Sequence, residues 1–190
     1  MYRRPLLEML DRYLRQHPEE ADVVERIQHL ATNSPDCFLR TCRPGHITGS
    51  AWVLSHDRGK CLLLHHAKLN RWLQPGGHAD GDGDVAAVAL REVREETGLT
   101  RLELVREEGL LTPLDVDVHR IPARLDDAGN VVEDAHEHHD IRFLIVAAAG
   151  QNLVRSNESN DLRWFGRDDL PRVTHEESVL RMLRKAGPFV

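Results

Sequence analysis

Apolar residues recur at helical spacing near the start of the chain and predict two helices. The first pattern stops at His17-Pro18, because proline disfavours helical backbone in the residue before it, and the second starts at Pro18-Glu19-Glu20 and closes at Asn33. We interpret residues 1–40 as a helical extension, packed either on the main domain of residues 41–190 or on a second subunit as a homodimer contact. The apolar stripes are Leu6, Leu7, Leu10, Tyr13 and Leu14, then Val23, Val24, Ile27 and Leu30.

Later segments have the apolar content of β-strands. Residues 46–54 and 61–66 flank the turn at Asp57-Arg58-Gly59 and predict a hairpin. The continuous apolar run over residues 141–148 is typical of a buried strand. Further predicted elements are strand-like stretches at 99–111 and 116–125, a turn at 126–130, a short strand at 163–165 and a closing helix at 177–186. Strands interleaved with helices predict an α/β fold with a mixed sheet.

The stretch from Gly76 to Leu99 predicts a loop, a helix and a second loop. Asp82 or Asp84 can cap the free N–H groups at the helix start, and Gly98 suits the left-handed position after its end. One helix face is apolar (Ala86, Ala89, Leu90 and Val93), and the other carries Glu92, Glu95 and Glu96. Like charges at this spacing repel. A cation bound over them explains the cluster, and carboxylates are ligands that Mg²⁺ or Mn²⁺ prefers.

These residues resemble the signature of the Nudix hydrolases, GX5EX7REUXEEXGU, where U is aliphatic. The matching positions are Gly77, Arg91-Glu92-Val93, Glu95-Glu96, Gly98 and Leu99. The resemblance implies the α/β/α sandwich of that family over about residues 40–186. One position departs from the pattern, because Gly83 stands where the family has its first glutamate. Asp82 and Asp84 flank it, and the sequence leaves open whether either serves instead.

The resemblance also implies roles for individual residues. It predicts that Glu92, Glu95 and Glu96, with the Gly76 carbonyl, hold Mg²⁺ or Mn²⁺, and that Arg91 orients a glutamate. Family members place the general base differently, so both Glu95 and Glu158 stay open, with Asp161 as a second loop candidate. For Glu158 and Asp161 a capping or turn role is an equal alternative.

Histidine-rich segments add candidate chemistry. The stretch 133–140 mixes carboxylates with three histidines but fits no defined zinc spacing, so we interpret it as a surface loop, with substrate contact as the alternative. If His138 or His139 faces the active site, it can meet a phosphate group. His65, His66 and His78 form a second group, in which His78 lies in the motif loop beside the expected diphosphate site. For His65 and His66 we expect packing or surface roles.

Composition limits the classes of partner. The net charge of −6 over 190 residues argues against a general nucleic-acid binder. No apolar run approaches the roughly 20 residues of a membrane span, and no secretory leader is evident at the N-terminus. Cys37, Cys42 and Cys61 are odd in number and match no zinc spacing, which favours reduced thiols and a cytoplasmic location.

The resulting hypothesis is a metal-dependent pyrophosphohydrolase. Its substrate is a nucleoside diphosphate linked to another moiety X, or a nucleoside triphosphate. One alternative is a non-catalytic nucleotide sensor, which Gly83 favours and the three intact glutamates disfavour. The other is an enzyme similar to isopentenyl diphosphate isomerase, which needs a reactive cysteine; Cys61, the nearest, lies in an apolar strand.

Overall fold

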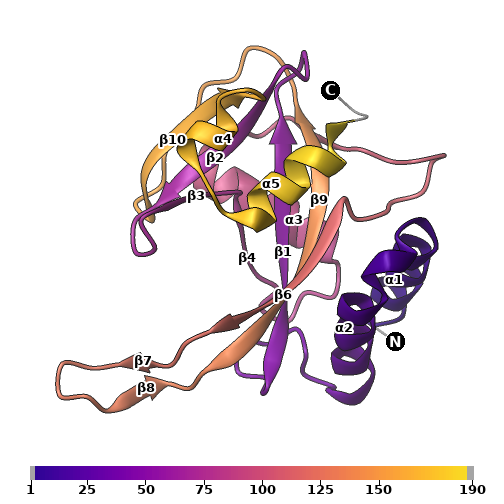
Figure 1. Cartoon of the computed structure of the whole chain (residues 1–190), viewed down its shortest axis with the longest axis vertical. Coiled ribbons are helices and arrows are strands. Elements are labelled where there is room, and N and C mark those ends of the chain that lie inside the picture. The colour runs from indigo at the N-terminus through magenta and orange to yellow at the C-terminus, as the bar shows by residue number, and fades with distance from the viewer. Residues whose placement is uncertain (1–2, 188–190) are drawn as a thin grey trace.

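A long parallel strand pair forms the centre of the fold. The computed structural model describes residues 3–187, and within that range no helix has the length and apolar character needed to cross a membrane. Figure 1 shows the arrangement of the helices and strands. They are α1 Arg4–Gln16, a 3-10 turn Pro18–Glu20, α2 Ala21–Asn33, β1 Gly45–Leu54, β2 Lys60–His66, β3 Arg71–Leu73, β4 Gly76–His78, α3 Val85–Thr97, β5 Leu102–Leu104, β6 Asp115–Ile121, β7 Arg124–Leu125, β8 Val131–Glu133, β9 His136–Ala147, β10 Ser159–Gly166, α4 Leu170–Val173 and α5 Glu177–Lys185.

The main sheet is mixed, with eight strands. Its longest path runs β10-β2-β1-β9-β5, and β3, β4 and β6 pair with β2, β1 and β9 respectively. Only β1 and β9 are parallel, with ten residues in register from Gly45 opposite Glu137 to Leu54 opposite Val146. The short β7–β8 hairpin projects away from the sheet (Figure 1).

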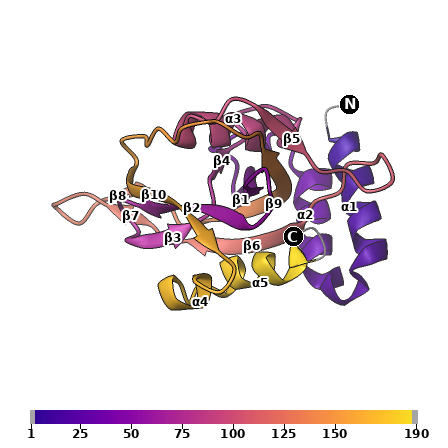
Figure 2. The same ribbon diagram turned by 90° about the horizontal axis from the view of Figure 1, so that it is seen from above.

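Alternation along the strands gives the sheet two different faces. Ile47, Ala51 and Val53 of β1 pack on the side that carries α3, whereas Trp52 and Leu54 belong to the cluster that α5 completes. Figure 2 shows α3 on one side of the sheet and α4 with α5 on the other. This is the predicted α/β/α arrangement, and it follows from the period of two in side-chain direction along a strand.

The predicted N-terminal helices are confirmed, and they pack on the domain. Leu10, Tyr13 and Ile27 are fully buried in the same cluster as the sheet residues. Arg12 donates to the Leu111 carbonyl at 3.0 Å. Figure 2 places α1 and α2 side by side next to the edge of the sheet near β5.

Several predicted strands have other bounds than expected. The strand-like stretch 99–111 contains only β5 and an isolated bridge between Glu107 and Leu110, so that prediction was largely wrong. The short strand at 163–165 is part of β10, which has eight residues. The largest error concerns 133–140, predicted as a surface loop. His136–Asp140 is instead the first part of β9, where His136, His139 and Asp140 are buried because β1 and β6 pair on either side.

A network of buried charges joins α5 to the sheet. Asp115, fully buried, accepts hydrogen bonds from Arg142 at 2.9 Å, Arg181 at 2.8 Å and Lys185 at 2.7 Å. Arg142 also contacts Asp140 at 2.8 Å and Asp117 at 3.0 Å. Burial alone would raise the pKa of Asp115, but the hydrogen bond from Arg181 and the neighbouring positive charges outweigh it, so this pKa lies below its ordinary value.

We predict that Asp115→Asn destabilises the fold by about 3–5 kcal/mol, because it leaves buried cations without their shared carboxylate. A lowered pKa contributes stability above the unfolded value of about 4 and loses it as the pH falls below that value. The variant should therefore lose less stability than the wild type below pH ~4. Urea unfolding at several pH values tests both statements. The exposed Asp127→Asn is the control, and equal midpoints for the two variants would contradict the prediction.

Candidate active site on helix α3

Local sequence fixes both ends of α3. The Asp84 side chain accepts from the Ala87 N–H at 3.0 Å, so Asp84, of the two predicted candidates, is the cap. Gly98 ends the helix with φ 72°, a conformation that costs glycine little. Val85, Ala86, Ala89 and Val93 are buried against the sheet. The helix is therefore held so that Glu95 is exposed while Glu92 and Glu96 are half-buried.

Two of these glutamates meet the glycine pair of β4. Glu96 accepts a hydrogen bond from the Gly76 N–H at 2.9 Å. At Gly77 a Cβ atom would lie 2.5 Å from the Glu92 carboxyl group, closer than such atoms ever approach. The second glycine of the motif is thus required by the position of Glu92, and β4 brings the backbone of residues 76–77 directly against the carboxylates.

Arg91 connects the helix to the strand. Its guanidinium donates to the His78 carbonyl at 2.7 Å and to Glu92 at 2.8 Å. The Glu95 carboxylate lies 3.9 Å from the Arg91 Nε, and its side chain is 63% exposed. Arg91 therefore orients Glu92, whereas Glu95 keeps most of its freedom and access to solvent.

Burial and mutual repulsion disfavour the ionised forms of the carboxylates at this site. Burial raises the pKa of Glu96 to about 8, and the negative charges of Glu92, Glu158 and Glu95 add to that shift. Burial raises the pKa of Glu92 as well, against the opposing effect of Arg91. A divalent cation would favour the ionised form of both carboxylates, and these side chains offer oxygen ligands. The residues present therefore fit a hard divalent metal ion.

Loop residues add carboxylates around this group. Glu158 is exposed in the turn before β10, and its charge reaches Glu96. Asp161 is bound to Arg163 and to the Leu162 N–H, which is a local structural role.

Asp80 is a candidate that the sequence analysis missed. Its charge contributes to the raised pKa of Glu92, and Arg40 binds it through two hydrogen bonds of 2.8 and 2.6 Å. Its φ of 51° turns the loop after β4. Asp82, in contrast, accepts from the Asp84 N–H, so both predicted substitutes for the missing first glutamate have local hydrogen bonds. An aspartate two residues after Gly76-Gly77-His78 was the available signal for Asp80.

The histidines group differently from the prediction. His78 does not join His65 and His66; its ring lies 5.1 Å from the rings of His46 and His138. His66 instead accepts from the Lys68 and Leu69 N–H groups in a turn, and His65 packs against Trp72. His139 points to the opposite side of β9, next to Glu137. The sequence analysis overlooked His46, whose strand position alone gave no signal.

Cys61 has no features of a catalytic thiol. It is buried in β2, and burial raises its pKa to about 12. Its Sγ lies 3.7 Å from the Phe165 carbonyl. An isomerase that depends on a reactive cysteine is therefore not supported at this position.

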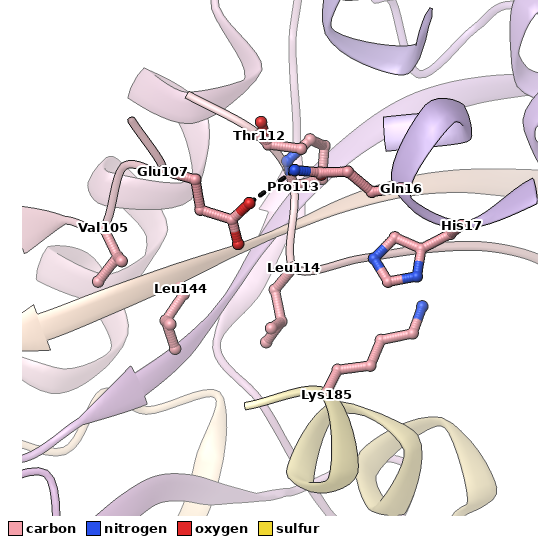
Figure 3. A pocket seen from close by; sticks show the side chains of 9 residues that line it. All are labelled: Gln16, His17, Val105, Glu107, Thr112, Pro113, Leu114, Leu144 and Lys185. Atoms are coloured by element: carbon pink, nitrogen blue, oxygen red, sulfur yellow. Dashed lines mark hydrogen bonds between the residues drawn. The ribbon is translucent and has the colours of Figure 1, made fainter. Parts of the chain in front are cut away.

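Two cavities lie elsewhere. One of about 200 Å³ lies between the end of α1, the segment after β5 and α5; Gln16, Glu107 and Lys185 line it (Figure 3). A larger one, of about 600 Å³, lies between α2 and the start of β9 and includes Arg26 and His139. Neither is lined by Glu92, Glu95 or Glu96, so the chemistry of α3, and not cavity volume, identifies the candidate site.

Comparison with known proteins gives the same fold and motif. The family model described as NUDIX domain matches residues 46–185. A Xenopus laevis protein, nucleoside diphosphate-linked moiety X motif 6, is 40% identical over 62 residues, which is 30% of this chain and 29% of that protein. The asymmetrical bis(5'-nucleosyl)-tetraphosphatase of Rattus norvegicus is 25% identical over 68% of this chain and 78% of its own length. The crystal structure of a NUDIX-family hydrolase from Clostridium perfringens superposes with a TM-score of 0.58 at 20% identity, covering 76% and 98% of the two chains.

In metal-free protein we predict that Glu96→Gln is stabilising at alkaline pH. A raised carboxyl pKa contributes stability below the unfolded value of about 4.3, and this is lost as the pH rises toward 8. Above pH 8 the variant should be more stable by on the order of 2 kcal/mol, since one pKa unit corresponds to about 1.4 kcal/mol and relaxation reduces the effect. Thermal melts in chelator across pH 5–9 measure this.

The exposed Glu103→Gln on β5 is the matched control and should follow the wild type. Adding Mg²⁺ at pH 8 should raise the melting temperature of the wild type more than that of Glu96→Gln. Parallel pH profiles for wild type and Glu96→Gln would contradict the prediction.

Proposed function

The chain belongs to the NUDIX family of hydrolases that act on phosphoric anhydride bonds, and from this premise we propose that it is a Mg²⁺-dependent pyrophosphohydrolase of a nucleotide. The observation that carries the proposal is the approach of Glu92 and Glu96 to the glycine pair of β4. There two half-buried carboxylates with raised pKa values lie together beside the backbone of Gly76 and Gly77. Mn²⁺ is the expected substitute, because it shares the preference for oxygen ligands.

The metal would be held by Glu92, Glu95 and Glu96, with the Gly76 carbonyl as a backbone ligand. When bound, divalent ions screen the phosphate oxygens and lower the pKa of the attacking water. Arg91 fixes the orientation of Glu92 through its 2.8 Å hydrogen bond. Asp80, held by Arg40, supplies further negative charge near Glu92, in the loop where Gly83 replaces the usual acid.

Two residues compete for the role of general base. Glu95 is exposed on α3, and Glu158 is exposed in the turn before β10, from where its charge reaches Glu96. Either can take a proton from a water molecule that enters from solvent. The positions of the two residues support both assignments equally.

The substrate class rests on the relatives. The tetraphosphatase of rat makes dinucleoside tetraphosphates the first compounds to test, and the Xenopus protein adds nucleoside diphosphates linked to another moiety.

We also propose that residues 1–40 are an extension of the hydrolase domain, 41–190. A homodimer, a lack of nucleic-acid partners and a cytoplasmic location remain predictions. The three free, buried cysteines support the last.

We predict that Glu92→Gln and Glu96→Gln each lower kcat/KM by on the order of 100-fold, because each removes a charge that stabilises the transition state through the metal. Release of phosphate or pyrophosphate is measured with Mg²⁺, with Mn²⁺ and with chelator. The panel comprises dinucleoside tetraphosphates, nucleoside triphosphates, ADP-ribose and nucleotide sugars. Glu103→Gln is the control and should retain full activity. Full activity in both site variants would place the site elsewhere, and silence of the folded wild type on every compound would favour the nucleotide sensor.

The general base is identified by pH–rate profiles of Glu95→Gln and Glu158→Gln. We expect the variant that lacks the base to lose the acidic limb of the kcat profile, since no carboxylate is left to be protonated there. The other variant should retain that limb. Two unchanged profiles would show that neither carboxylate is the base.

A further inference from the structure

Five imidazoles gather on the sheet face opposite α3. In the strand register His46 of β1 lies opposite His138 of β9, which in turn lies opposite His119 of β6. His136 and His78 complete this group, which we call the histidine cluster. Neighbouring rings are between 4.8 and 5.5 Å apart, measured between centroids. The cluster includes His78 of β4 and contains none of the α3 carboxylates.

Three members present ligand atoms to one another. His46, His136 and His138 each offer a ring nitrogen, and these nitrogens all lie within 4.8 Å of one another. In a tetrahedral zinc site with metal–nitrogen bonds near 2.05 Å, ligand nitrogens are roughly 3.4 Å apart. Rotations of the rings that bring the nitrogens closer together would be needed to reach that separation. The three backbones are already fixed by pairing within one sheet.

Buried ring nitrogens in this group lack partners. His46 is 1% exposed, and neither of its nitrogens has a hydrogen bond within the described part of the chain. The Nε2 of His138 is likewise buried without a partner. Burying polar atoms unpaired is costly and rare in folded proteins. A bound ion would satisfy these atoms at once.

The surroundings of His136 match those of a metal ligand. Its Nδ1 lies 2.8 Å from the Asp134 carbonyl, which selects the tautomer that donates from Nδ1 and leaves a lone pair on Nε2. Histidines that bind metals are commonly oriented by such a contact. The Glu133 carboxylate lies 4.0 Å from that Nε2 and supplies nearby negative charge.

The rings are also able to bind metal. The ring nitrogens of His46 and the Nε2 of His138 are buried and accept no hydrogen bond among the described residues, so they are available to a metal ion. Neutral imidazoles favour zinc and neighbouring transition metals over Mg²⁺. His119, with a side chain 44% exposed, lies beside His138 and connects the cluster to solvent.

We propose that His46, His136 and His138 form a second metal site, specific for Zn²⁺ or a similar transition-metal ion and separate from the α3 carboxylates. Three histidines leave the fourth coordination position for water or for an anionic oxygen. His78, whose ring lies 5.1 Å from the rings of His46 and His138, borders the group of three ligands. The proposal does not depend on the proposed hydrolase activity, because no carboxylate of α3 takes part.

Co²⁺ is the probe, because coordination by several nitrogens in a site of low coordination number gives visible absorption bands that an oxygen-ligated octahedral ion lacks. The full-length protein, stripped with chelator, is titrated with Co²⁺ and then with Zn²⁺. We expect one equivalent of Co²⁺ to produce these bands and Zn²⁺ to abolish them. Glu92→Gln/Glu96→Gln should leave them unchanged, which separates this site from the catalytic one.

His46→Gln and His138→Gln should lose the bands, together with the rise in melting temperature that Zn²⁺ gives the wild type. His139→Gln is the matched control, since it removes a buried imidazole from the same strand on the opposite face. In case a variant does not fold, imidazole nitrogen NMR signals of the wild type are followed during Zn²⁺ titration. Those of His46, His136 and His138 should shift while that of His139 does not.

Absence of the bands in folded wild type overturns the proposal, and so does their persistence in both His46→Gln and His138→Gln. NMR shifts confined to other histidines overturn it as well. In that case the histidine cluster is a set of neutral rings that pack together without a metal.

Discussion

The parallel pairing of β1 with β9 determines where everything else lies. Ten residues of each strand are in register, so each side chain of β1 has a fixed neighbour on β9. With the period of two along each strand, this register assigns every residue to one of two faces. A shift by one residue would exchange the face that binds α3 with the face that carries the histidines.

On the face opposite α3, the register produces a gradient of polarity. At one end, His46, His138 and His119 form a row, and the next row places Thr48, Asp140 and Asp117 together. The third row carries Arg142 and Asp115, which α5 covers with Arg181 and Lys185. Beyond it, Trp52 and Leu144 form the apolar core beneath α5. The helix α5 therefore covers the charged and apolar rows but not the histidine row. The polar atoms of the histidines need partners other than α5.

How far the sequence predicted the structure depended on how local the information was. The α3 helix, a cap at either Asp82 or Asp84 and the glycine at its end could be predicted, because each depends on residues within one or two turns. The approach of Glu92 to Gly77 could not be derived from spacing. The start of β9 was mistaken for a loop because both of its faces are polar: Asp140 hydrogen-bonds Thr48 and Ser50, and Glu137 pairs with Arg26. Partners 90 residues or more away leave no periodic signal. The pairing of Asp80 with Arg40, 40 residues apart in the sequence, likewise leaves no periodic signal and was missed.

The three residues of β4 show how the sheet keeps the carboxylates of α3 apart from the imidazoles of the histidine cluster. Gly77 faces α3, where any side chain would collide with the Glu92 carboxyl group, and His78 faces the opposite way, toward His46 and His138. The carbonyl of His78 accepts from Arg91, so its backbone supports the carboxylate site while its ring belongs to the histidine cluster. Carboxylate oxygens prefer hard cations and imidazole nitrogens prefer transition metals. Alternation along a single strand is thus enough to separate oxygen donors from nitrogen donors across the thickness of one sheet. The two neighbouring residues Gly77 and His78 of β4 face the two groups.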